Sequence, residues 1–88
     1  MNFTFKSLQE YAELPKEVRA KVPKAILNYI RNPGHPRLKV KKVSKLGPNV
    51  YRFRIDPKYR IHLEKKGEKK SSLIIRAIGG HRLEGIGD

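Results

Sequence analysis

The stretch that decides the fold runs from Val50 to Glu64 and reads VYRFRIDPKYRIHLE. With a period of two, it places large apolar side chains on one side and mostly charged ones on the other, which is typical of two half-buried strands. The apolar side carries Tyr51, Phe53, Ile55, Tyr59, Ile61 and Leu63, and the other side carries Arg52, Arg54, Arg60, His62 and Glu64. The stretch therefore predicts a β-hairpin with one face in a core.

The hairpin places arginines directly opposite each other. If residues 56–58 (Asp-Pro-Lys) form the loop, Arg54 faces Arg60 and Arg52 faces His62. Like charges at such positions destabilise a ladder. An anionic ligand explains the cluster most simply, because guanidinium groups match phosphate oxygens. The alternative is that the long side chains extend into solvent, where salt screens their repulsion.

The residues before the hairpin, about 5–32, form a helical half. Ser7 and Glu10 have the spacing of a capping box, which predicts a first helix from about Leu8 to Glu13. Pro15 is suited to open a second helix. Its apolar face consists of Val18, Val22, Ala25, Ile26, Tyr29 and Ile30. Pro23 lies inside this pattern and predicts a kink or a split near Lys21.

The sheet half covers about residues 37–82 and is followed by a short flexible tail, 83–88. LKVKKV (38–43) is a strand candidate, and SLIIRAI (72–78) is the most apolar strand, which favours a central place in the sheet. NFTF (2–5) is either a very short strand or an extended lead-in. We expect a single α+β domain, 1–88, with two antiparallel helices packed on one face of an antiparallel sheet of about four strands, the arginine side remaining open.

Charge is the strongest global feature of the chain. Its 88 residues include 21 Lys and Arg against 8 Asp and Glu, a net charge of +13. Such a balance attracts polyanions, and nucleic acid is the first partner to consider. There is no cysteine, and the acids are scattered without ligand spacing, so we expect no metal and no cofactor. No long apolar segment occurs, so we expect a cytoplasmic protein without a membrane partner.

The order of these elements, with VYRFRI, a tight turn, YRIHLE and IGGHR, resembles the RelE/ParE superfamily of small bacterial and archaeal toxins from about residue 7 to 84. The RelE-like branch cleaves mRNA in the ribosomal A site without a metal. The resemblance thus implies the toxin of a toxin–antitoxin system, a ribosome-dependent mRNA endonuclease that inhibits translation. It also implies a small acidic antitoxin as the partner that holds the toxin inactive.

Matching the family position by position implies a site on the strands. The two basic residues of the first hairpin strand fall on Arg52 and Arg54, the arginine that opens the next strand on Arg60, and the residue past the last strand on His81. We expect Arg54 and Arg60 to hold the phosphate and His81 to transfer the proton, because histidine titrates near neutral pH. The expected RNA-binding residues are Arg52, Lys58, Arg82 and His62, and His62 is the second candidate for proton transfer.

The tail LEGIGD leaves an alternative open. Members of the RNA-cleaving branch often carry a catalytic tyrosine there, and this tail has no aromatic residue. Its absence favours a non-catalytic member of the same fold, either a ParE-like gyrase inhibitor or a degenerate toxin that only binds RNA or antitoxin. The cluster of Arg54, Arg60 and His81 favours the endonuclease.

Overall fold

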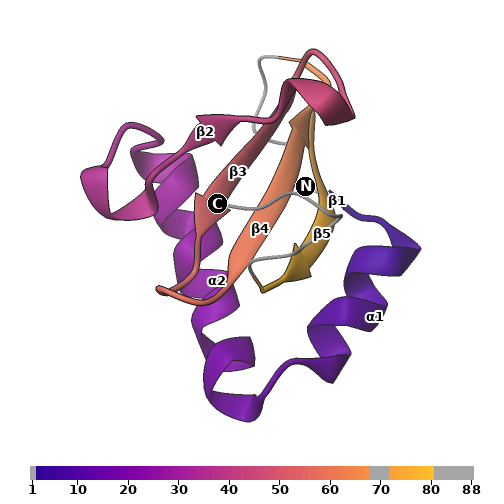
Figure 1. Cartoon of the computed structure of the whole chain (residues 1–88), viewed down its shortest axis with the longest axis vertical. Coiled ribbons are helices and arrows are strands. Elements are labelled where there is room, and N and C mark those ends of the chain that lie inside the picture. The colour runs from indigo at the N-terminus through magenta and orange to yellow at the C-terminus, as the bar shows by residue number, and fades with distance from the viewer. Residues whose placement is uncertain (1, 68–71, 81–88) are drawn as a thin grey trace.

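A computed structural model of the chain describes residues 2–67 and 72–80. In these ranges two α-helices and two short 3-10 helices accompany a five-stranded sheet (Figure 1). The elements are β1 (Asn2–Phe3), α1 (Phe5–Glu13), α2 (Lys16–Arg31), η1 (Pro36–Leu38), β2 (Lys41–Lys42), η2 (Ser44–Leu46), β3 (Val50–Arg54), β4 (Arg60–Lys65) and β5 (Leu73–Gly79). The predicted α+β class is confirmed.

The sheet has the strand order β1-β5-β4-β3-β2. Its pairs are antiparallel except for β1, which pairs in parallel with β5. The sheet is therefore mixed and one strand wider than expected, because the lead-in at Asn2–Phe3 forms ladder hydrogen bonds. The apolar β5 is an interior strand, as predicted, and β4 occupies the middle. Figure 1 shows α2 behind the sheet and α1 beside β5.

The hairpin has the predicted register, with Arg54 opposite Arg60 and Arg52 opposite His62. Asp56 shapes its turn, because Oδ1 accepts hydrogen bonds from the backbone N–H groups of Lys58 (2.8 Å) and Tyr59 (2.9 Å). An aspartate that bonds the backbone two and three residues further on is a common way to fix a tight turn. The turn and the period-two pattern together set which side chains meet across the ladder.

The core lies between the helices and the apolar face of the hairpin. Phe53, Ile61, Leu63 and Ile75 are fully buried there. Tyr29 of α2 stacks on Phe53 with ring centroids 4.8 Å apart and an interplanar angle of 15°. The apolar side chains of α2 that the sequence pattern predicted complete this layer; Val18, Val22, Ala25, Ile26 and Tyr29 are buried and Ile30 packs against them. The two faces of the hairpin are thus assigned as expected.

The predicted capping box at Ser7 is wrong. Helix α1 begins at Phe5, and its N-cap is Thr4, whose Oγ1 accepts a hydrogen bond from the N–H of Ser7 (3.1 Å). The N–H of Thr4 also donates to the carbonyl oxygen of Ile75 (3.0 Å), so the chain leaves the sheet and enters the helix at one residue. Glu10 instead accepts a hydrogen bond from the N–H of Ile78 at Oε1 (3.0 Å), which continues the pairing of β5 beyond β1.

Two further expectations are corrected. Of the predicted kink or split near Lys21, the split is wrong: helix α2 continues through Pro23, and Val22 and Ile26, both buried in the core, lie on either side of it. Burial of an apolar face contributes more to a helix than the local propensity of one residue. In the stretch 38–43 only Lys41–Lys42 is a strand, because Leu38 is buried as the last residue of η1. Neither of the two α-helices combines the length and hydropathy that a span across a bilayer needs.

Candidate nucleic-acid interface

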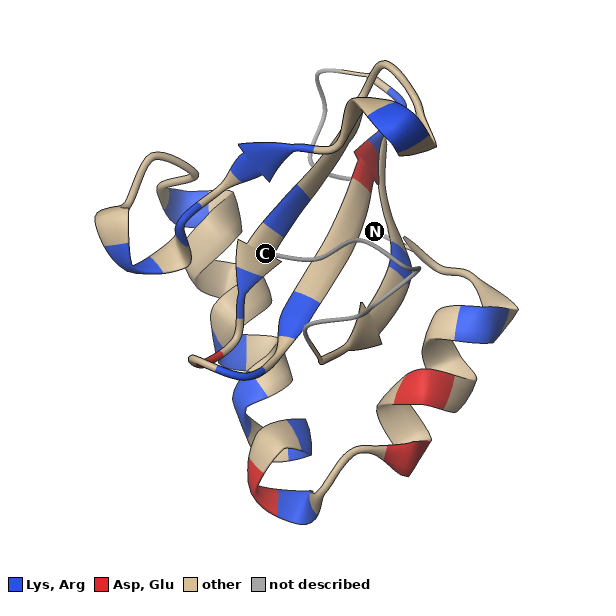
Figure 2. Cartoon of the chain, viewed as in Figure 1, with Lys and Arg blue, Asp and Glu red and all other residues tan. Residues whose placement is uncertain are grey.

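The register brings basic side chains of three strands together on the sheet face opposite the core. Arg54 of β3 lies across from Arg60 of β4 in one row. The next row consists of Lys41 of β2, Arg52 of β3 and His62 of β4. We call the face that carries Arg52, Arg54, Arg60 and His62 the arginine face. Figure 2 shows Lys and Arg on each of these strands, whereas the acids of the described residues lie on α1, at the start of α2, in the hairpin turn and at the end of β4.

We expected the arginine face to be open, but three of its four side chains are buried. Only 9% of Arg52, 5% of Arg60 and 1% of His62 is exposed, and Arg54 is half-buried. His62 belongs to the middle strand, with Arg52 on one side and Ala77 on the other. The cluster is therefore a packed set of groups and not the open, solvated surface that the alternating pattern predicted.

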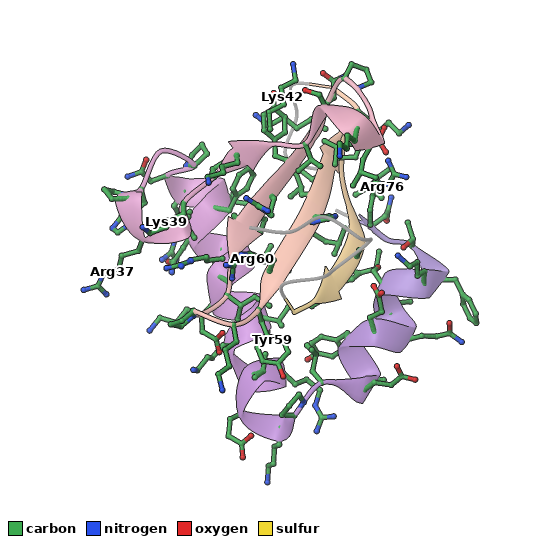
Figure 3. All side chains as sticks on the ribbon, viewed as in Figure 1. Arg37, Lys39, Lys42, Tyr59, Arg60 and Arg76 are labelled. Carbon is green, nitrogen blue, oxygen red and sulfur yellow. The ribbon has the colours of Figure 1, made fainter. Side chains whose placement is uncertain are left out.

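The hairpin loop fixes the guanidinium of Arg60. Its Nη1 lies 3.3–3.4 Å from the carbonyl oxygens of Asp56, Pro57 and Tyr59. These oxygens carry negative partial charge, so they offset part of the repulsion from Arg54. The side chain is labelled in Figure 3, where it lies beside the loop that it contacts. Arg60 thus stabilises the turn as well as contributing charge to the arginine face.

Arg76 is a basic residue that the sequence reasoning missed. His62 pairs with Ala77 but Leu63 pairs with Ile75, so Arg76 is an extra residue at an irregularity of the β4–β5 ladder. Its Nη1 lies 3.6 Å from Oε1 of Glu64 and donates to the carbonyl oxygen of Leu46 (3.2 Å). A lone arginine in an otherwise apolar strand was the available sign in the sequence. Such an insertion re-aims a side chain, and here it directs Arg76 to the end of the arginine face at η2.

Glu64 is shared between two cations. Besides Arg76, its Oε2 lies 3.1 Å from Nζ of Lys66. Glu64 is the acid of this hairpin face, as the sequence showed, and it pairs at the end of the strand remote from Arg54 and Arg60. The positive charge around the hairpin turn is therefore not compensated by this carboxylate.

The remaining predicted site residues fall into two groups. Lys58 is exposed in the hairpin loop, as expected for a residue near the edge of the arginine face. His81 and Arg82 lie outside the described residues, so their placement stays a prediction. His62 is the histidine that the described part of the chain brings to the arginine face. In the same ranges, no group of three or more His, Asp or Glu side chains lies close enough to hold a metal ion.

Comparison with known proteins places this fold. No family model and no curated protein sequence matches the chain. Among solved structures, the RelB–RelE antitoxin–toxin complex of Methanococcus jannaschii matches with a TM-score of 0.68 at 19% identity, over 93% of this chain and 92% of the other. The YoeB/ParE toxin of Agrobacterium tumefaciens matches with a TM-score of 0.71 at 18% identity, over 90% and 94% of the two chains. The chain has the RelE/ParE fold.

A YoeB dimer from Staphylococcus aureus gives a similar match, with a TM-score of 0.71, 17% identity and 91% and 93% of the two chains covered. The resemblance seen in the sequence is thus confirmed for the fold. In this version of the RelE/ParE fold, the basic rows occupy β2, β3 and β4 on the face away from the core.

The helices of this RelE/ParE fold also form an apolar groove. It has a volume of about 520 Å³ between α1 and α2, and its lining includes Phe3, Leu8, Tyr11, Ile26 and Leu27. Leu8 and Leu27 are about half exposed, at 50% and 49%. Exposed apolar surface of this kind marks sites where other proteins bind.

Proposed function

We propose that this protein is the toxin of a toxin–antitoxin system that acts in the cytoplasm and cleaves ribosome-bound mRNA without a metal. The observation that carries the proposal is the packed row of Arg54 opposite Arg60, flanked by the row of Lys41, Arg52 and His62. Like charges held in register repel each other, and an anionic ligand relieves that repulsion. A phosphate of RNA supplies that charge and suits guanidinium geometry.

Each residue has a distinct role in the proposed reaction. The 2′-hydroxyl of RNA attacks the adjacent phosphate, so a base must take its proton and an acid must protonate the leaving oxygen. Arg54 and Arg60 stabilise the charge on the pentacovalent phosphate. Arginine keeps its proton, so the proton transfer is assigned to His81, with His62 as the second candidate. Arg52, Lys58 and Arg82 hold the flanking RNA.

The proposed partner is a small acidic antitoxin. The solved structures of RelE and YoeB include complexes with the antitoxins RelB and YefM. This chain resembles those two toxins in fold alone. The groove between α1 and α2 offers an apolar seat, and α2 also carries the exposed cations Lys16 and Lys24. An acidic amphipathic segment complements both features. If it binds there, Leu27→Asp should lose the complex with the acidic product of a neighbouring gene, whereas Lys58→Gln should retain it.

Primer extension on mRNA from cells that briefly express the protein tests the proposal. Cuts in phase with codons are expected. The missing aromatic residue in the tail LEGIGD favours the non-catalytic alternatives, which give a different result. Intact mRNA together with gyrase-dependent DNA breaks would support a ParE-like gyrase inhibitor, and intact mRNA without such breaks would support a degenerate toxin.

A further inference from the structure

A second basic surface adjoins the arginine face at the hairpin turn. It is a groove of about 640 Å³ between η1 and the end of β3, lined by Pro36, Arg37, Lys39, Arg54, Ile55 and the loop residues Asp56 and Pro57. Arg54 belongs both to this groove and to the arginine face. We call it the η1 groove. A strand of RNA bound at Arg54 and Arg60 therefore reaches the η1 groove without crossing another element.

The η1 groove has a strong excess of positive charge. Asp56 is the one carboxylate among the described residues of its lining, and it already accepts two backbone hydrogen bonds and lies 3.6 Å from Nζ of Lys21. In the sequence no Asp or Glu occurs between Glu17 and Asp56, whereas eleven Lys and Arg do. In Figure 2, η1 and β2 carry Lys and Arg and no acidic residue of their own. The charge favours a polyanion as the ligand.

The cations of the η1 groove are attached to an ordered turn. Leu38 is buried in the core with 4% exposed, and it anchors η1 to the sheet. Nδ1 of His35 accepts a hydrogen bond from the N–H of Arg37 (3.1 Å), which caps the turn. Lys39 adopts a left-handed conformation with φ of 49°, which residues other than glycine rarely do and which recurs at ligand sites. The backbone that carries Arg37 and Lys39 (Figure 3) is thus positioned before a ligand binds, and this lowers the backbone entropy cost of binding.

A polar pocket lies next to the η1 groove and shares Arg37 with it. Its volume is about 290 Å³, and it is lined by Asn28, Arg31, Asn32, His35, Arg37 and Leu38. That volume is roughly ten times the share of one liquid water, ~30 Å³, so a ring system fits. Asparagine amides both donate and accept hydrogen bonds, and imidazole and guanidinium groups stack on bases. The lining has the chemistry that recognises an unpaired nucleobase.

We propose that the η1 groove and the adjoining pocket form a second RNA-binding site for a single-stranded segment. Phosphates of the segment bind Arg37 and Lys39, and one unpaired base enters the pocket at Asn28 and Asn32. The inference rests on the proposed function, since it extends the path of the same RNA. An acidic protein would bind Arg37 and Lys39 but would not need the side-chain amides of Asn28 and Asn32. A duplex would present its bases paired, with their Watson–Crick edges hidden.

Fluorescence anisotropy of the full chain with a labelled single-stranded RNA, measured over a range of salt concentrations, tests the site. Arg37→Gln/Lys39→Gln should reduce the slope of log affinity against log salt by about 1.4, because each lost phosphate contact on a single strand changes it by about 0.7. The matched control Lys16→Gln/Lys24→Gln removes the same charge from exposed positions of α2 and should leave the slope near the wild-type value. Asn28→Ala/Asn32→Ala should weaken binding with an unchanged slope. Thermal melts establish that each variant is folded, and Arg37→Gln alone replaces the double variant if Lys39→Gln is not.

Three results would overturn the inference. The first is an equal slope for the η1 variant and its α2 control. The second is wild-type affinity of the Asn28/Asn32 variant for single-stranded RNA. The third concerns polyglutamate, used as a mimic of an acidic protein. If Arg37→Gln/Lys39→Gln loses polyglutamate binding but retains RNA binding, the η1 groove belongs to an acidic protein. In each case the proposed function still stands if the wild-type protein cuts mRNA. A wild-type protein that neither binds nor cuts RNA would contradict both the proposed function and the second RNA-binding site.

Discussion

Arg54 and Arg60 lie directly opposite each other across the β3–β4 ladder, and the loop that joins the strands holds Nη1 of Arg60 through three carbonyl oxygens. The two arginines therefore differ in their structural contribution although they share a face. Arg60 contributes to the turn and to the positive charge, whereas no hydrogen bond of this kind ties Arg54 to the described part of the loop. Variants of the two arginines can therefore distinguish an effect on RNA binding from an effect on folding.

Arg54→Ala and Arg60→Ala should both weaken RNA binding and each should lower its salt slope by about one unit or somewhat less. Only Arg60→Ala should also lower the melting temperature, because it removes the hydrogen bonds to the loop carbonyls. Binding titrations in several salt concentrations and thermal melts give the two quantities. Unchanged binding in both variants would exclude the arginine face as an RNA site.

Phe53→Ala should destabilise the protein by about 3–5 kcal/mol, the usual cost of removing a buried aromatic ring. Phe53 is fully buried and stacks on Tyr29. Leu27→Ala is the control, because Leu27 is half exposed and its truncation should cost much less. Urea unfolding measures both free energies. A Phe53→Ala protein as stable as the Leu27→Ala protein would mean that the faces of β3 are assigned the wrong way round.

Glu10→Ala should cost about 1–3 kcal/mol, because it leaves the N–H of Ile78 without its carboxylate acceptor. Glu10→Gln keeps an acceptor oxygen at the same reach and should restore most of that stability. Hydrogen exchange at the Ile78 amide provides a local readout, with fast exchange expected in the alanine variant. Equal exchange in all three proteins would show that α1 does not stabilise the edge of β5.

Tyr29 should make the stability sensitive to alkaline pH. Burial raises the pKa of its phenol above the usual value of 10, and the nearby Lys65 lowers it by less. The unfolded phenol ionises near pH 10 while the folded one stays neutral, so stability is retained below pH 10 and falls as the pH rises through the folded pKa. Tyr29→Phe keeps the aromatic ring but removes the hydroxyl group that ionises. Its melting temperature should fall less between pH 8 and pH 10.5, and equal losses in both proteins would contradict the assignment.

The sequence predicted the hairpin because two independent features agreed there. The alternation from Tyr51 to Leu63 set the faces, and Asp56 with Pro57 set the turn, so the opposition of Arg54 and Arg60 followed. The N-terminus of α1 was misassigned because Ser7 and Thr4 are both good caps. Only the pairing of the Thr4 backbone with β5 decides between them.

The site was less predictable than the fold. Period-two reasoning gives the face of a side chain but not what covers it, so the burial of Arg52 and His62 was not foreseen. Arg76 reaches the end of the arginine face only because of an irregularity in the β4–β5 register, which the sequence does not mark. The η1 groove was missed for a similar reason, since Lys39 was expected in a strand over 38–43 and instead lies, with Arg37, beside a buried Leu38.

Cleavage of a labelled mRNA by the purified protein, with and without ribosomes, tests the central claim most directly. The account predicts cuts in phase with codons when ribosomes are present and none when they are absent. It also predicts that His81→Gln loses cleavage and retains ribosome binding, because glutamine keeps much of the polarity of histidine but cannot titrate. Intact mRNA on ribosomes that have bound the wild-type protein would contradict the account.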